Sequence, residues 1–251
     1  MIRACLTALA LCLTAPAAHA FDIKAMTAEE RENFRSEIRS YLLENPEVLM
    51  ESIAVLEERR AAEAAAQEGE LLEEYQAAIF DDGYSWIGGN PDGDVTIVEF
   101  LDYRCGYCKR AHPEVQTLLS EDGNIRIIVK EFPILGPESE LASRYAIATK
   151  MVEGDEAYAT VHDALMLWDG PINEAALGRV AREAGLSDHA AIMAEMGSEE
   201  IGGIIANNRM LGQALNIQGT PSFIMGDTFV RGYVNLEQMQ GIVESLRAEA
   251  G

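Results

Sequence analysis

Two cysteines stand three positions apart in the stretch Cys105-Gly106-Tyr107-Cys108. This spacing serves zinc sites, iron–sulfur clusters, covalent haem attachment and thiol–disulfide exchange. Covalent haem attachment needs a histidine directly after the second cysteine, where this sequence has Lys109. A zinc or iron–sulfur site needs further ligands, and no other cysteine is expected in the mature chain. The pair therefore favours thiol–disulfide exchange.

The first twenty residues have the pattern of a cleavable signal peptide, with Arg3, an apolar run over 6–13 and a small-residue end at Ala20. We expect cleavage after Ala20 and an exported, periplasmic product. Cleavage would remove Cys5 and Cys12 and leave the close pair alone. A disulfide within so short a loop restricts the unfolded chain very little, so a structural disulfide is the weaker interpretation.

The net charge and the hydropathy of the chain limit the kinds of partner that we expect it to bind. The chain has 42 acidic and 19 basic residues; without residues 1–20, which hold one basic residue (Arg3), 18 basic residues remain and the net charge is −24. This acidity disfavours nucleic acid and anionic membranes as partners. A membrane anchor is not expected, because the apolar run is too short to span a bilayer and Leu11 precedes Cys12 where a lipoprotein signal needs a small residue.

The cysteine pair lies between two predicted strands. The β-branched runs at 95–101 and 125–132 indicate buried strands, and the segment from Cys105 to about Leu119 indicates a helix that connects them in a βαβ unit. A helix start stabilises negative charge, so we expect Cys105, as the more exposed of the two cysteines, to be the attacking thiolate and Cys108 to be the buried resolving thiol. Gly106 and Tyr107 are uncharged, which predicts a less extreme oxidant than a pair with histidine between the cysteines.

The N-terminal part is helical in pattern. Thr27 and Glu30 form a predicted capping box for a helix that ends near Glu44, and Asn45-Pro46 begins a second helix through Gln67. The apolar stripe of these helices is too thin for a core of its own, so the helices either lie against their own domain or pair with copies of themselves. The preferred interpretation is a homo-oligomer. The predicted organisation is a signal peptide at 1–20, a helical oligomerisation segment at 21–80 and a main domain at 82–250.

Helix-breaking residues divide the rest of the main domain into its predicted elements. Several helices are expected over 137–215, with no strand pattern among them. A β-hairpin follows, with strands at 222–225 and 228–231, and a terminal helix begins at Leu236. An edge strand is expected at 84–87. The fold class is thus α/β, with a helical insertion and an N-terminal helical extension.

With these motifs, the chain resembles the DsbA-like branch of the thioredoxin superfamily over about 82–250. Gly219-Thr220-Pro221 stands where this family carries a cis-proline opposite the dithiol, so the resemblance implies that Thr220 and Pro221 hold substrate beside Cys105. It also implies that Glu99 is a buried acid that moves protons at the resolving cysteine. Pro113 matches the proline that bends the active-site helix.

The stretch 41–49 resembles the ScsC-like group, and Cys-Gly-Tyr-Cys with threonine before the proline resembles the DsbC-type isomerases. The resemblance implies a thioredoxin-like fold, no cofactor beyond the redox-active dithiol, misoxidised or unfolded secreted proteins as substrates, and a membrane redox partner. An isomerase or reductase is the preferred interpretation. A dithiol oxidase and a copper-binding module that uses the two thiols and His112 remain alternatives. Lys130 either lends positive charge to the pair or is a solvated strand lysine.

Overall fold

The computed structural model describes residues 23–250, so the expected signal peptide at 1–20 lies outside the described residues. The chain divides into two compact units, one up to Ala61 and one from Ala62 onward. Within residues 23–250, no helix combines the length and the apolar character that crossing a membrane requires.

The first unit consists of α1 (Ala28–Glu44), a short 3-10 turn before it, and the first half of α2 (Glu47–Glu74). The predicted capping box is confirmed: the backbone N–H of Thr27 donates to the Glu30 carboxylate at 2.8 Å, and the backbone N–H of Glu30 donates to the Thr27 hydroxyl at 3.3 Å. Neither α1 nor α2 contains a buried residue. The apolar stripe of these helices is therefore exposed within the single chain.

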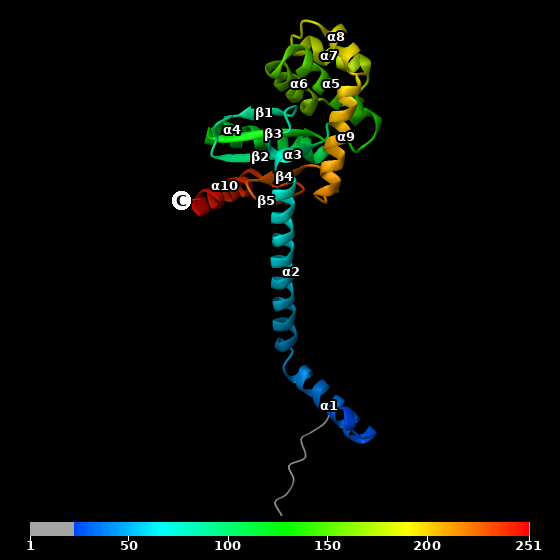
Figure 1. Ribbon diagram of the computed structural model, residues 1–251, viewed down its shortest axis with the longest axis vertical. Helices are drawn as coiled ribbons and strands as arrows, with labels where there is room; N and C mark the ends of the chain where they lie inside the picture. The colour runs from blue at the N-terminus through cyan, green and yellow to red at the C-terminus, as the bar shows by residue number, and fades with distance from the viewer. Residues whose placement is uncertain (1–22, 251) are drawn as a thin grey trace, which may run out of the picture. The chain divides into compact units, whose positions relative to one another are not determined.

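The second unit is built on a five-stranded sheet in the order β1-β3-β2-β4-β5 (Figure 1). Its strands are β1 (Trp86–Gly89), β2 (Val95–Leu101), β3 (Ile125–Glu131), β4 (Ser222–Met225) and β5 (Thr228–Arg231). The strands β2 and β3 are parallel and are joined by α4 (Gly106–Asp122), whereas the other neighbouring pairs are antiparallel. The predicted βαβ unit, hairpin and edge strand are confirmed. The edge strand, β1, begins and ends two residues later than predicted.

Side chains of β2 alternate between two helical layers. Val95 and Ile97 pack with α4 and with α10 (Leu236–Ala250) on one face of the sheet. Val98 and Phe100 pack on the other face with α3 (Gln76–Phe80) and the end of α9 (Glu199–Ala214). The sheet is therefore covered on both faces, which explains why nearly every residue of β2 and β3 is buried.

The helical insertion is a further group beside the sheet (Figure 1). It comprises α5 (Pro137–Glu153), α6 (Asp155–Leu167), α7 (Glu174–Glu183), α8 (His189–Glu195) and the start of α9. Its buried side chains share one core with Tyr103, Cys108 and Val129. The insertion thus covers the end of β2 at which the cysteine pair lies.

The unit that contains the sheet begins earlier than the predicted boundary at residue 80. The helix α2 runs to Glu74, past the predicted end at Gln67, and is followed by α3. Leu71, Leu72 and Tyr75 pack against the core that contains Ile79. The end of α2 therefore belongs to the sheet-bearing unit because its apolar residues cover one face of the sheet.

Candidate active site

Cys105 is the N-cap residue of α4, directly after the turn that follows β2. Its sulfur accepts a hydrogen bond from the backbone N–H of Cys108 at 3.4 Å. That N–H is one of the donors that a helix start leaves without an intrahelical partner. Cys105 is 7% exposed and Cys108 is completely buried, so the first sulfur is the one a substrate can reach.

The two thiols differ strongly in acidity. The pKa of Cys105 is lowered from 9.0 to about 5, chiefly by the hydrogen bond from the Cys108 thiol, and further by the Thr220 side chain and by the backbone N–H groups of Cys108 and Tyr107; burial opposes this shift. The protonated Cys105 thiol can also donate to the Thr220 carbonyl at 3.0 Å, a contact that favours the thiol. The hydrogen-bond donors around the Cys105 sulfur outnumber this one carbonyl acceptor, so Cys105 is a thiolate at neutral pH.

Cys108 has the opposite environment. Burial raises the pKa of its thiol far above 9.0, and its hydrogen bond to Cys105 and the nearby Glu99 carboxyl act in the same direction. At neutral pH Cys108 therefore keeps its proton and donates it to Cys105. The pair combines one ready nucleophile with one thiol that must lose a proton before it can attack.

The residues between the cysteines lie at the surface. Gly106 begins α4, and a Cβ atom there would have no neighbour within 4 Å, so close packing does not require glycine. Tyr107 is 61% exposed, and its ring lies 6.3 Å from that of Tyr233. The Arg110 guanidinium lies over the Tyr233 ring at 4.5 Å. An aromatic and cationic surface thus borders the reactive sulfur.

The predicted cis-proline is confirmed at the Thr220–Pro221 bond. The Thr220 carbonyl lies 3.0 Å from the Cys105 sulfur, although the two residues are far apart in sequence. A cavity of about 560 Å³ adjoins this loop, and it is lined by Asn216, Gln218, Gly219, Thr220, Ser222, Arg231 and Gly232. An extended peptide bound beside the loop would meet backbone groups and polar side chains.

Glu99 lies on β2, on the sheet face that α4 covers, and is 3% exposed. Burial raises its pKa from 4.5 to about 8, and the neighbouring Glu131 and Cys105 add to the shift. Because the Glu99 carboxyl affects the pKa of Cys108, the two groups are electrostatically coupled. Glu99 is therefore a buried carboxyl whose protonation and that of Cys108 affect one another.

Glu131 was not predicted from the sequence as a residue of the site. It ends β3 on the same sheet face as Glu99, in the register that places it opposite Leu101. Burial raises its pKa to about 7, although hydrogen bonds from Tyr158 and Tyr103 lower it. Its other carboxylate oxygen is buried without a hydrogen-bond partner. No signal in the sequence pairs this carboxyl with Glu99, because β3 is buried on both faces.

A hydrogen-bonded network extends from Glu131 into α6. The Tyr103 hydroxyl donates to Glu131 at 2.8 Å and lies 3.1 Å from Nδ1 of His162. Burial, together with the neighbouring His112, lowers the pKa of His162 to about 3, so its ring is neutral at neutral pH. His112 in turn lies 3.1 Å from the Asp163 carboxylate. His112 is thus grouped with His162 and Asp163, and neither cysteine belongs to that group.

Lys130 fits neither of its expected roles. It is fully buried on the sheet face opposite the thiols, beside Phe100 in the register. Its ammonium donates to Asp82 at 2.5 Å and to the Ala78 carbonyl at 2.8 Å. This ion pair joins the segment before β1 to the sheet, so Lys130 is a structural residue. Pro113 lies inside α4, as expected.

Asp102 connects the cysteine turn to the loop after β3. Its carboxylate accepts hydrogen bonds from the backbone N–H groups of Arg104, Ile134 and Leu135, at 2.7, 2.8 and 3.0 Å. The side chain is completely buried. These contacts fix the turn that presents Cys105, so Asp102 positions the nucleophile without touching it.

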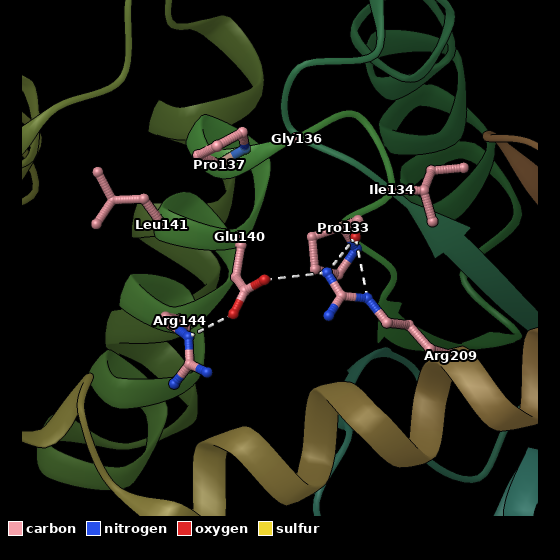
Figure 2. Close-up of a pocket in the computed structure, with 8 residues that line it drawn as sticks. All are labelled: Pro133, Ile134, Gly136, Pro137, Glu140, Leu141, Arg144 and Arg209. Atoms are coloured by element: carbon pink, nitrogen blue, oxygen red, sulfur yellow. Dashed lines mark hydrogen bonds and ion pairs between the residues drawn. The ribbon is translucent and has the colours of Figure 1, made fainter.

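A second cavity, of about 750 Å³, lies where the loop after β3 meets α5 and α9 (Figure 2). Glu140 lies between two arginines there, accepting from Arg144 at 3.0 Å and from Arg209 at 3.2 Å. Arg209 also donates to the Pro133 carbonyl at 2.7 Å. Neither cysteine lines this cavity, and its charges are paired, so it is not the reactive centre.

Comparison with known proteins agrees with this geometry. The family model described as "DSBA-like thioredoxin domain" matches residues 96–244, and the model described as "Copper resistance protein ScsC N-terminal domain" matches residues 30–63. Among curated proteins, Disulfide bond formation protein D of Bacillus subtilis is 24% identical over 170 residues, which are 62% of this chain and 74% of that protein. The chain spans about a quarter of the length of the first curated relatives it matches, the Na⁺/H⁺ antiporters NhaA 3 of Salinispora tropica and NhaA 1 of Salinispora arenicola, at 26% and 28% identity over 65% and 63% of this chain.

Solved structures give the same result. A thioredoxin-like oxidoreductase from Silicibacter pomeroyi DSS-3 is 41% identical, with a TM-score of 0.64, over 68% of this chain and 97% of that one. A linker-deletion mutant of Proteus mirabilis ScsC is 26% identical, with a TM-score of 0.67, over 90% and 98%. A periplasmic thioredoxin-like protein from Salmonella enterica serovar Typhimurium is 26% identical, with a TM-score of 0.62, over 68% and 94%. The chain has a thioredoxin-like fold and belongs to the family of DSBA-like thioredoxin domains, with an N-terminal segment of the ScsC type.

Proposed function

We propose that this protein is a periplasmic thiol–disulfide oxidoreductase that isomerises or reduces disulfides in secreted proteins. The observation that carries the proposal is the unequal acidity of the pair, with the pKa of Cys105 at about 5 and that of Cys108 far above its ordinary value. Export rests on the signal-peptide pattern of residues 1–20 and on the likeness to a periplasmic thioredoxin-like protein. The mechanism needs no cofactor beyond the dithiol.

In the first step the Cys105 thiolate attacks one sulfur of a substrate disulfide. A bond forms between Cys105 and that sulfur, the substrate S–S bond breaks, and the other substrate sulfur leaves as a thiolate. If a second substrate thiolate attacks the substrate sulfur of this mixed disulfide, Cys105 is released as a thiolate. The substrate has then exchanged one disulfide for another without net oxidation, which is isomerisation.

Reduction uses Cys108 instead. Its thiol gives a proton to a base, and the resulting thiolate attacks the Cys105 sulfur, which releases the substrate sulfur as a thiolate and leaves a Cys105–Cys108 disulfide. Two electrons pass from the dithiol to the substrate. Glu99 is the proposed base, because it is buried and electrostatically coupled to Cys108, and its pKa of about 8 lies near neutrality. Electrons from a membrane redox partner would regenerate the dithiol.

One observation favours the oxidase as a second candidate. A low pKa stabilises the thiolate, and therefore the reduced form, which makes the disulfide form a stronger oxidant. Cys105 reaches a pKa of about 5 without a charged residue between the cysteines. This result weakens the expectation from Gly106 and Tyr107 that the pair is a mild oxidant.

Two assays decide between these roles. The reduced protein should reactivate scrambled ribonuclease A under a glutathione buffer, and the oxidised protein should introduce disulfides into reduced ribonuclease A more slowly than it isomerises them. The equilibrium of the dithiol against glutathione gives the direction of electron flow. Fast oxidation without reactivation of scrambled enzyme would contradict the isomerase and support the oxidase.

We also propose that the N-terminal helices make the protein an oligomer. The residues Phe34, Ile38 and Tyr41 recur at helical spacing on α1 and are 39%, 44% and 55% exposed. Leu49, Ile53 and Leu56 on α2 are 48%, 47% and 46% exposed. Exposed apolar stripes of this kind are typical of interaction surfaces, and the ScsC N-terminal domain model matches this segment.

Ile38→Glu is therefore expected to lower the mass of the full chain to that of a monomer, because the new charge would be desolvated in the interface. Light scattering measures this change. Ser36→Glu places the same charge on the same helix outside the apolar stripe and should leave the oligomer intact. A wild-type chain that is already monomeric, or equal effects of the two substitutions, would contradict the proposed interface.

A further inference from the structure

Three potential metal ligands meet where α4 contacts α6. One nitrogen each from His112 and His162 and one carboxylate oxygen from Asp163 all lie within 4.8 Å of one another. The imidazole of His112 and the Asp163 carboxylate are already 3.1 Å apart. The two histidines are 7% and 3% exposed, whereas the Asp163 side chain is 52% exposed. The cluster therefore has a buried base and opens to solvent at the carboxylate.

Hydrogen bonding determines which nitrogen of His162 is available. The Tyr103 hydroxyl gives its single proton to Glu131, so towards Nδ1 of His162, at 3.1 Å, it can only accept. Nδ1 then carries the ring proton, and the lone pair is on Nε2. Metal-binding histidines are held in this way, with the second ring nitrogen donating to an oxygen. The His162 ring is also fixed by stacking on Tyr158, at a centroid distance of 5.9 Å and an interplanar angle of 9°.

We propose that His112, His162 and Asp163 bind a divalent first-row transition metal ion, and Zn²⁺ is the expected occupant. Two imidazole nitrogens and one carboxylate oxygen are a donor set that suits zinc, with water completing the coordination on the open side. Zinc–ligand distances of about 2.0–2.2 Å require the ligand atoms to lie about 3.3 Å apart. This separation is shorter than the 4.8 Å within which the three ligand atoms of the cluster lie. The pair formed by His112 and Asp163, at 3.1 Å, already has about this separation.

The site is separate from the redox chemistry. Neither thiol belongs to the cluster, so neither cysteine supplies a ligand to it. Metal binding also does not rest on the proposed isomerase function. The alternative is that the contact between His112 and Asp163 is only a structural hydrogen bond, and a metal titration distinguishes the two.

The test uses the full mature chain with the Cys105–Cys108 disulfide formed, so that no thiolate competes for metal. Calorimetric titration with Zn²⁺ should show one site per chain. Co²⁺ should give the intense visible bands of a site with low coordination number rather than the weak bands of hexaaqua cobalt. Asp163→Asn replaces the carboxylate by a neutral amide at an exposed position and should weaken Zn²⁺ binding by at least about 10-fold.

His112→Asn should weaken binding to a similar extent, with circular dichroism used to verify that the variant is folded. The matched control is His189→Asn, because His189 bonds to Tyr145 and lies outside the cluster. It should leave the zinc site unchanged. The proposal is overturned if oxidised protein binds no stoichiometric Zn²⁺, or binds several equivalents weakly on its acidic surface with no change in Asp163→Asn.

Discussion

Cys105→Ser is expected to lower the rate of disulfide exchange by about 10³-fold or more, because serine offers no thiolate to attack a substrate sulfur. Cys108→Ser should behave differently. The Cys105 thiolate remains and can attack, but the step in which Cys108 releases the substrate is lost. Substrate proteins should therefore accumulate as mixed disulfides with Cys105. Turnover of scrambled ribonuclease and non-reducing mass spectrometry measure these two outcomes.

Alkylation provides an independent measure of the same asymmetry. At pH 6 a thiol with a pKa of about 5 is mostly ionised, whereas a free cysteine with a pKa of about 8.5 is ionised to well under about 1%. The lower basicity of the sulfur offsets part of this advantage, and a net rate about 10-fold above that of free cysteine is expected. The rate should level off above pH 6 and vanish in Cys105→Ser. A rate that keeps rising to pH 8.5 would contradict the assigned acidity.

The sequence was sufficient for features that depend on local patterns. The capping box at Thr27, the strands on either side of the cysteine pair and the hairpin after Pro221 were predicted and are confirmed. Each follows from neighbouring residues, such as a side chain that caps its own helix or a turn that joins two short strands. The cis bond before Pro221 came from the resemblance to a family.

Features that depend on distant partners were not predictable in this way. In β3 the residues from Ile125 are buried almost throughout, charged residues included, so their alternation does not distinguish one buried face from the other. Lys130 and Glu131 follow one another and are both buried, on opposite faces. The partner of Lys130 is Asp82, from the segment before β1, and the donors to Glu131 are Tyr103 and Tyr158. Sequence spacing gives no sign of these long-range pairs.

The two buried acids add an element to the site that the cysteine motif does not reveal. Glu99 and Glu131 lie on one sheet face, and each is buried and has a raised pKa, at about 8 and about 7. The charge of Cys105 contributes to the shift at Glu99. Formation of the disulfide removes this charge, so the proton affinity of Glu99 should fall upon oxidation. Electron transfer and proton transfer are therefore coupled at this carboxyl.

The buried carboxyl of Glu99 should make the free energy of unfolding depend on pH. The pKa of Glu99 is about 8 in the folded chain, above its value of 4.5 without the protein environment. Between these pH values the folded state binds more protons than the unfolded state, so Glu99 lowers stability progressively as pH rises from about 4.5 to about 8. Glu99→Gln does not titrate. Relative to wild type it should gain roughly 4 kcal/mol across this window.

Urea denaturation of the reduced proteins at pH 5, 6, 7 and 8 measures this difference, and the comparison cancels the opposite contribution of Cys105. The lowered pKa of Cys105 adds stability as pH rises from about 5 to 9, equally in both proteins to a first approximation. Glu121→Gln, at an exposed position of α4, is the matched control and should follow wild type.

Parallel pH profiles for wild type and Glu99→Gln would show that Glu99 is ionised throughout. It could not then hold the proton that Cys108 must release, and the proposed reduction step would need a different base, for which Glu131 is a second buried carboxyl on the same sheet face.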